Sequence, residues 1–165
     1  MTENLNIPKT MQVYPFFKEN SEIIQYDETN RDTIPFFKVL QNPLVLPDDL
    51  EKEISQLFLK WKKTEVQLTE VYEIRNKTEI RPKMVSMIAN YLTILFWMNG
   101  KHPLNLQSIA LEIDSLKKKP INCKERILFI LSKPELFHSF IQLRELYIEL
   151  EKQFALQCAL NTYKK

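Results

Sequence analysis

PKMVSMIANYLTILFWMNG, residues 82–100, is the segment from which the architecture of this chain follows. Proline favours the first turn of a helix, and glycine favours the left-handed position just past a helix end. Between Pro82 and Gly100 apolar residues fall on every side of the expected helix, which is typical of a buried helix. We therefore predict a central core helix over residues 82–99.

A helix that is apolar on all sides can lie in a bilayer as well as in a protein. The run from Met84 to Met98 would span about 22 Å as a helix, which is shorter than the ~30 Å hydrocarbon core of a membrane. It also contains Ser86, Asn90 and Thr93, and the start of the chain lacks the features of a signal peptide. We expect a protein interior, and a cytoplasmic protein that does not contact a membrane.

Two long stretches without proline are expected to hold the long helices. The first begins at Asp48 and reaches about Arg75, although Thr64 and Glu65 interrupt its apolar stripe, so a break near Thr64 is the alternative. Residues 76–79 then form the turn into the central helix. The stripe consists of Leu50, Ile54, Leu57, Phe58, Trp61, Leu68, Val71 and Tyr72.

The second long stretch, residues 134–160, repeats apolar residues in alternating steps of four and three, which indicates a helix packed along another helix. Its seam consists of Leu136, Phe140, Leu143, Tyr147, Leu150, Phe154 and Gln157. The 48–75 helix is the expected partner. A homodimer through the 134–160 helix is the alternative, but Phe137, Ile141 and Ile148 widen the stripe, so a monomer is favoured.

Shorter helices are expected over residues 35–41, 106–116 and 123–131. Capping signals precede three of the expected helices: Thr33, the Asn122/Glu125 pair, and the Ser132/Glu135 pair with Pro134 in the first turn. The predicted fold is all-α, a single-domain bundle of about six helices around the central helix. Residues 48–165 form the bundle, and residues 1–47 form a largely irregular arm packed on it.

The arm is acidic and rich in aromatic residues. Two similar motifs occur in it, YPFFK at residues 14–18 and IPFFK at residues 34–38. Their phenylalanines either pin the arm onto the core of its own domain, which we favour, or dock a partner protein. These residues are Phe16, Phe17, Phe36 and Phe37.

The chain contains one glycine, Gly100, and this excludes the glycine-rich loops that cradle phosphate groups. Walker A and GxGxxG motifs are absent, so no cofactor is predicted. Cys123 and Cys158 lie far apart and form no CxxC or cysteine–histidine cluster. We therefore predict no metal site and two reduced cysteines.

Charge is distributed unevenly, because residues 60–133 carry 14 basic and 7 acidic side chains. One basic cluster, at 60–83, contains Lys60, Lys62, Lys63, Arg75, Lys77, Arg81 and Lys83. The other, at 117–126, contains Lys117, Lys118, Lys119, Lys124 and Arg126. The clusters could contact nucleic acid or an acidic partner, or they could form a solvated face that pairs with the acidic arm. No aromatic platform for single strands accompanies them in the sequence.

The segments PINCKERILFILSKP at 120–134, HSFIQL at 138–143 and ELEKQ at 149–153 resemble the C-terminal part of the YpoC-like family of uncharacterised bacterial proteins. FWMNG at 96–100 extends the resemblance to about the last 70 residues. The resemblance implies no activity, cofactor or catalytic residue. Genes of this family often lie beside DNA-replication and repair genes, which implies a link to nucleic acid without assigning a residue.

Three functions are compatible with these features. A non-enzymatic protein-interaction or adaptor module with an unknown protein partner is the first prediction, because no catalytic constellation is present. The alternative is a nucleic-acid-binding accessory protein linked to DNA replication or repair, which would use the clusters at 60–83 and 117–126. An enzyme without a recognisable motif is third, and its polar groups would be Asn90, Thr93 and His102. We predict no catalytic residue.

Overall fold

The computed structural model describes the backbone of residues 1–164 and the side chains of residues 1–161. The described chain contains six α-helices, two short 3-10 helices and one two-stranded sheet, which confirms the predicted all-α bundle of about six helices. The elements are β1 (Glu3–Asn6), η1 (Lys9–Met11), β2 (Ile23–Tyr26), η2 (Arg31–Thr33), α1 (Phe37–Gln41), α2 (Leu50–Glu73), α3 (Lys77–Met98), α4 (Ile109–Asp114), α5 (Cys123–Ser132) and α6 (Phe137–Lys164).

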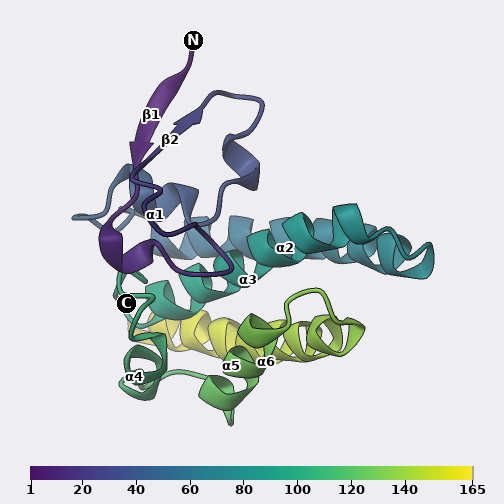
Figure 1. The fold of residues 1–165 in the computed structure, drawn as a ribbon. Helices are drawn as coiled ribbons and strands as arrows, with labels where there is room; N and C mark the ends of the chain where they lie inside the picture. The colour runs from purple at the N-terminus through teal and green to yellow at the C-terminus, as the bar shows by residue number, and fades with distance from the viewer. Residues whose placement is uncertain (165) are drawn as a thin grey trace.

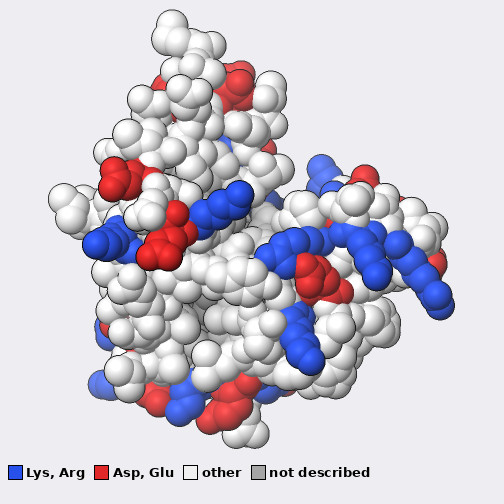
Figure 2. All heavy atoms as spheres, viewed as in Figure 1, with Lys and Arg blue, Asp and Glu red and all other residues white. Residues whose placement is uncertain are grey.

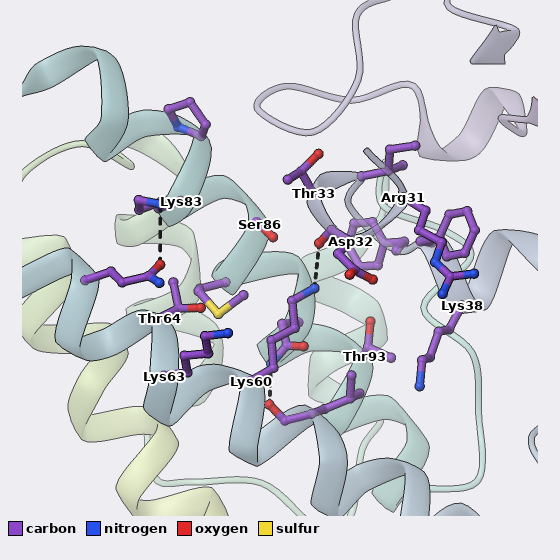
Figure 3. A pocket seen from close by; sticks show the side chains of 18 of the residues that line it. Arg31, Asp32, Thr33, Lys38, Lys60, Lys63, Thr64, Lys83, Ser86 and Thr93 are labelled. Atoms are coloured by element: carbon purple, nitrogen blue, oxygen red, sulfur yellow. Dashed lines mark hydrogen bonds between the residues drawn. The ribbon is translucent and has the colours of Figure 1, made fainter. Parts of the chain in front are cut away.

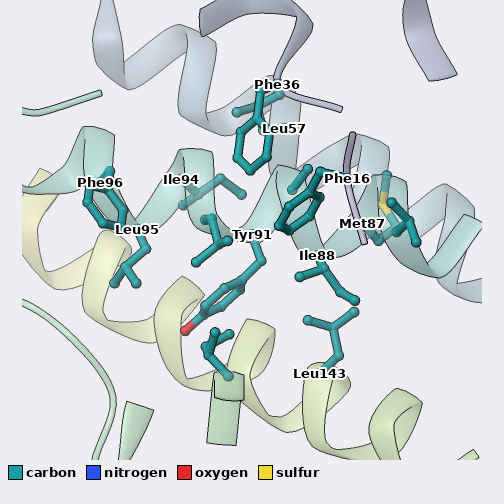
Figure 4. Packing of buried hydrophobic residues seen from close by; sticks show 14 of the residues in the cluster. Phe16, Phe36, Leu57, Met87, Ile88, Tyr91, Ile94, Leu95, Phe96 and Leu143 are labelled. Carbon is teal, nitrogen blue, oxygen red and sulfur yellow. The ribbon is translucent and has the colours of Figure 1, made fainter. Parts of the chain in front are cut away.

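Helices α2 and α3 lie side by side in the middle of the molecule (Figure 1). The arm covers one side of this pair, and α4, α5 and α6 lie on the other side. Helix α6 packs against α2, α3 and α5, so the predicted pairing of the last helix with the first long helix is present. Every residue of α3 from Met87 to Met98 is buried. Figure 4 shows Phe16 and Phe36 of the arm above α3 and Leu143 of α6 below it.

The end of α3 matches the prediction, whereas its start does not. Gly100 adopts a left-handed φ of 72°, and the amides of Gly100 and Lys101 bond back to the carbonyls of Trp97 and Phe96 at 3.0 Å. This is the Schellman geometry that glycine favours. The helix begins at Lys77 rather than at Pro82, which is its sixth residue. Proline is tolerated there because Pro82 lies near the exposed start of the helix, where water can solvate the carbonyl left unbonded.

Helix α2 is one continuous helix of 24 residues, as we favoured, and it has no break at Thr64. It ends with the same Schellman geometry, but with Arg75 in the left-handed position at φ 56°. The amide of Asn76 bonds to the carbonyl of Val71 at 3.0 Å, and that of Arg75 bonds to Tyr72 at 3.2 Å. The turn into α3 therefore lies at residues 74–76, and the prediction of a turn at 76–79 is wrong.

The predicted capping interactions do not form. Thr33 lies in η2, where its hydroxyl donates to the carbonyl of Asn30, and α1 begins only at Phe37. Asn122 precedes α5 with a left-handed backbone and no side-chain bond to the helix. Ser132 is the last residue of α5 and donates to a carbonyl of its own helix. Helix α6 starts at Phe137, after Pro134, and α4 is limited to Ile109–Asp114 instead of residues 106–116.

The arm contains regular structure that the sequence did not indicate. Strands β1 and β2 pair antiparallel, with Leu5 opposite Ile24. The connection between them spans residues 7–22 and has no tight-turn signal, so a hairpin could not be recognised. Leu5, Ile7 and Met11 are buried and join the common core. The arm is therefore packed on the bundle, but it is less irregular than predicted.

Three weakly acidic side chains are buried between α3, α5 and α6, and their burial predicts that the folded protein loses stability at high pH. Burial raises the pKa of the Cys123 thiol from 9.0 to about 11. Burial also raises the pKa values of Tyr91 and Tyr147 above their ordinary value of 10.0. An unfolded chain releases these protons at lower pH than the folded chain does. These three groups therefore leave the free energy of unfolding steady between pH 7 and about pH 8, and they are expected to lower it between pH 9 and 11, by about 2 kcal/mol from Cys123 alone.

Urea unfolding measured between pH 7 and pH 11 tests this expectation. The Cys123→Ala variant is the control, because it should show a shallower fall over the same range. A pH-independent unfolding midpoint in the wild-type chain would contradict the burial of these groups.

Candidate functional site

A groove of about 620 Å³ lies between the arm and the α2–α3 pair, and it combines an apolar lining with basic walls (Figure 3). Its apolar lining includes Leu57 of α2, Met87 of α3 and Phe36 of the arm. The basic side chains come from η2, α1, α2 and α3, and they are Arg31, Lys38, Lys60, Lys63 and Lys83. Two carboxylates, Asp32 and Glu79, also line it. The groove thus has more positive than negative side chains.

Two of the five cations are occupied by contacts within the protein. The ammonium of Lys60 donates to the backbone carbonyl of Asp32 at 2.7 Å, which ties α2 to the arm. Burial lowers the pKa of Lys60. Lys38 of α1 forms an ion pair with Glu53 of α2. These two contacts link the arm to α2 along the groove.

The other three cations have no carboxylate partner among the residues that the structure describes. Lys63 lies on α2, and Lys83 lies on the neighbouring α3, where it donates to the amide oxygen of Gln67 at 3.4 Å. Arg31 comes from the opposite wall. Figure 3 shows Lys60 and Lys63 on the α2 wall and Arg31 on the wall formed by the arm. Arg31, Lys63 and Lys83 can therefore bind an anion without breaking an internal ion pair.

The polar groups proposed for a motif-less enzyme are not brought together. Asn90 and Thr93 line the groove, but Asn90 donates to Leu57 and Tyr147, and Thr93 donates to a carbonyl of its own helix. His102 lies elsewhere: its Nδ1 accepts from Trp97 and its Nε2 lies 2.9 Å from the carbonyl of Val45.

The described side chains contain no group of histidine, cysteine, aspartate or glutamate residues that could hold a metal ion. In residues 1–164 no helix combines the length and apolarity needed to cross a membrane.

The basic cluster at 60–83 is divided by the fold. Lys60, Lys63 and Lys83 line the groove, whereas Lys62 points to α6 and pairs with Glu151 at 3.1 Å. Its other members, Arg75, Lys77 and Arg81, lie where α2 and α3 join. Figure 2 shows basic side chains gathered over that end of the molecule.

The basic cluster at 117–126 lies in the α4–α5 connection and the first turn of α5, on the other side of the α2–α3 pair from the groove (Figure 1). Lys117 and Lys118 are exposed. The ammonium of Lys119 donates to carbonyls at the end of α4, Lys124 pairs with Asp114 at 2.9 Å, and Arg126 pairs with Glu149 at 3.0 Å. The two clusters therefore do not share one face, and most of the second one is occupied internally.

The four phenylalanines predicted to dock a partner also differ from one another in how accessible they are. Phe16, Phe17 and Phe36 are buried in the core, so their rings are not available to a partner. Phe37 is half-buried, packs edge-to-face on Tyr26 at 4.8 Å and lines the groove. Docking of a partner is therefore proposed only for Phe37.

The basic residues that the arm contributes to the groove were not predicted from the sequence. Arg31 and Lys38 are isolated in an acidic stretch, and only the packing of the arm on α2 places them beside Lys60 and Lys63. Because neither residue belongs to a basic cluster in the sequence, no pattern marked them as site residues. The separation of Lys62 from its neighbours, in contrast, follows from the helical period of 3.6 residues.

Comparison with known proteins places the chain in a family. The family model described as "YpoC-like protein" matches residues 51–162, which is wider than the last 70 residues that carried the resemblance in the sequence. The chain is 33% identical over 144 residues to "Uncharacterized protein YpoC" of Bacillus subtilis (strain 168), covering 87% of each chain. No solved structure matches. The chain belongs to the YpoC-like protein family.

Proposed function

We propose that this protein is a non-enzymatic binding module whose groove takes an acidic segment of a partner protein. The observation that carries the proposal is the set of three cations, Arg31, Lys63 and Lys83, that line an apolar groove and lack a carboxylate partner in the described part of the chain. Charges of one sign around a groove attract a ligand of the opposite sign and orient it.

A protein segment suits the lining better than a nucleic-acid backbone does. Asp32 and Glu79 share the groove with the cations, and neither forms an ion pair with a described side chain, so both would repel a ligand that carries a negative charge at every repeat. A peptide can place carboxylates beside the lysines and apolar side chains against Ile34, which is half-buried in the lining. The half-buried ring of Phe37 adds apolar surface to the same groove.

The contribution of each cation can be bounded. Ion pairs between partly exposed groups contribute about 0.2–1 kcal/mol each. Replacing Lys63 and Lys83 with glutamate removes two such pairs and adds two repulsive ones. The combined change is expected to weaken binding of an acidic peptide at least ~10-fold.

Fluorescence anisotropy with a labelled peptide of alternating glutamate and leucine tests the proposal at low salt. The wild-type protein is expected to bind the peptide, and Lys63→Glu/Lys83→Glu to lose at least ~10-fold in affinity. The matched control is Lys52→Glu/Lys152→Glu, which makes the same charge change at two exposed lysines outside the groove. The control should bind within about 2-fold of the wild type.

Two results would overturn the proposal. One is a wild-type protein that does not bind the peptide, and the other is an equal loss of affinity in the control. A labelled single-stranded oligonucleotide that binds through Lys63 and Lys83, while the peptide does not, would assign the groove to nucleic acid instead. The melting temperature of each variant shows whether a loss reflects unfolding.

A further inference from the structure

A second cavity, of about 1100 Å³, lies where the α2–α3 turn meets the start of α6. It shares no lining residue with the groove. Four of its lining residues are basic, namely Arg75, Lys77, Arg81 and Arg144, and two are acidic, namely Glu73 and Glu135. The aromatic rings of Tyr72 and Phe137 also line it.

The aromatic rings form a column that leads from the core to the surface. The guanidinium of Arg144 lies 4.7 Å from the ring centre of Phe140, and that ring stacks on Tyr72 at 5.1 Å with an interplanar angle of 15°. Phe137 packs edge-to-face on Tyr72 at 5.4 Å. The Tyr72 hydroxyl lies 2.9 Å from the carbonyl of Glu135, to which it donates, so the segment before α6 is also fixed.

Phe137 is the outer ring of this column, and 56% of its surface is exposed. A large aromatic ring that is held in place and exposed to solvent offers a flat surface on which another ring can stack. The structure therefore presents a fixed stacking surface on the rim of a cavity with basic walls.

The backbone positions that carry the cations beside this ring are also fixed. Arg75 is fixed in the left-handed position that ends α2, and Lys77 is the first residue of α3. Neither has a carboxylate partner among the described side chains. Arg81 pairs with Glu135 and lies 5.1 Å from the ring centre of Tyr14.

We propose that this cavity binds single-stranded nucleic acid, with one base stacked on Phe137 and the backbone phosphates at Arg75 and Lys77. An exposed aromatic ring beside a basic surface is the combination that single-strand binding uses, and it tolerates any base because every base has a flat face. The proposal goes beyond the proposed function, because it concerns a different site and a different class of ligand.

The acidic residues on the rim of the cavity allow a test in which the affinity for an oligonucleotide is expected to rise. Glu135 is neutralised by Arg81, whereas Glu73 is exposed and has no cationic partner among residues with described side chains. Its carboxylate would repel a phosphate. Glu73→Gln is therefore expected to tighten binding of an oligonucleotide about 2-fold or more at low salt.

The probe is a fluorescein-labelled 15-nucleotide oligothymidylate, measured by anisotropy over a range of salt concentrations. Phe137→Leu should weaken binding about 5-fold or more, because it removes the flat ring, while Phe137→Tyr keeps the ring and should bind as the wild type does. Arg75→Asn/Lys77→Gln should reduce the slope of log K against log salt by about 1.4, and asparagine suits the left-handed position. Lys52→Gln/Lys152→Gln is the control and should leave the slope unchanged.

The proposal is overturned if the wild type does not bind the oligonucleotide at about 50 mM salt, where phosphate contacts are little screened. It is also overturned if Phe137→Leu binds the oligonucleotide as tightly as the wild type does. Loss of oligonucleotide binding in Lys63→Glu/Lys83→Glu, with none in the Phe137 and Arg75 variants, would place the nucleic acid in the groove and also overturn it. Binding of the glutamate–leucine peptide through Phe137 and Arg75, without the oligonucleotide, would identify a protein-binding cavity. The proposal for the groove is tested independently, because it depends on binding of the peptide through Lys63 and Lys83.

Discussion

The Tyr147→Ala variant is expected to unfold with a free energy about 4 kcal/mol lower than that of the wild type. Tyr147 of α6 is 1% exposed, and its ring stacks on Trp61 of α2 with centres 4.0 Å apart and an interplanar angle of 3°. The rings of Tyr91 and Phe58 pack edge-to-face on it at 5.1 and 6.4 Å. Removing this ring leaves a cavity where α2, α3 and α6 meet, and large-to-small changes at such positions cost about 3–5 kcal/mol.

The hydroxyl of Tyr147 makes a separate contribution. It donates to the carbonyl of Met87 at 2.6 Å and accepts from the amide of Asn90 at 3.0 Å. Tyr147→Phe keeps the ring and leaves the Asn90 amide with the carbonyl of Leu57 as its partner. The expected loss is therefore about 1–2 kcal/mol, which is well below that of the alanine variant.

Urea unfolding followed by circular dichroism measures both losses. Ile148→Ala is the matched control, because Ile148 is the next residue of the same helix but is 43% exposed, so the expected loss is under about 1 kcal/mol. If Tyr147→Ala cost no more than this control, the packing of α6 on the α2–α3 pair would be wrong. Equal losses in the alanine and phenylalanine variants would show that the ring contributes little.

The sequence was sufficient to predict the long helices because burial imposes a period on them. The seam from Leu136 to Phe154 and the stripe from Leu50 to Tyr72 both required a helical partner, and the structure pairs these two helices. The helix ends were harder to predict. Arg75 occupies a left-handed position that a sequence rule assigns to glycine, and Pro82 lies inside a helix that a rule would start there.

The candidate sites were only partly predictable, because they are assembled from distant segments. Lys63 and Lys83 meet in the groove because α2 and α3 are neighbours, and that pairing was expected only in general terms. Arg31 joins them through the packing of the arm. Phe137 and Arg75 lie 62 positions apart and meet only at one end of the bundle, so no local motif could show that the basic residues had an aromatic ring beside them.

Replacing Phe16 or Phe36 with alanine is the second large expected effect, with a loss of about 3 kcal/mol in the free energy of unfolding for each. Both rings are buried between the arm and α3, and they pack edge-to-face with centres 4.9 Å apart. If the two motifs served only to dock a partner, their rings could be removed without cost to the fold. A loss of this size would show that the arm is part of the core.

The double variant Phe16→Ala/Phe36→Ala separates the pair contact from burial. Because the two rings touch, the losses should not add, and an interaction free energy of about 1 kcal/mol is expected. Leu44→Ala is the control within the arm, since Leu44 is 94% exposed and its truncation should change stability by less than about 0.5 kcal/mol.

The same variants also test whether the groove depends on the arm. Arg31 and Lys38 are held beside α2 only while the arm is docked, so a variant whose arm has detached should lose affinity for the glutamate–leucine peptide. Binding of oligothymidylate at Phe137 should change less, because the lining of that cavity comes from α2, α3 and the start of α6. Unchanged stability in Phe16→Ala and Phe36→Ala, with loss of peptide binding alone, would instead assign these rings to the partner.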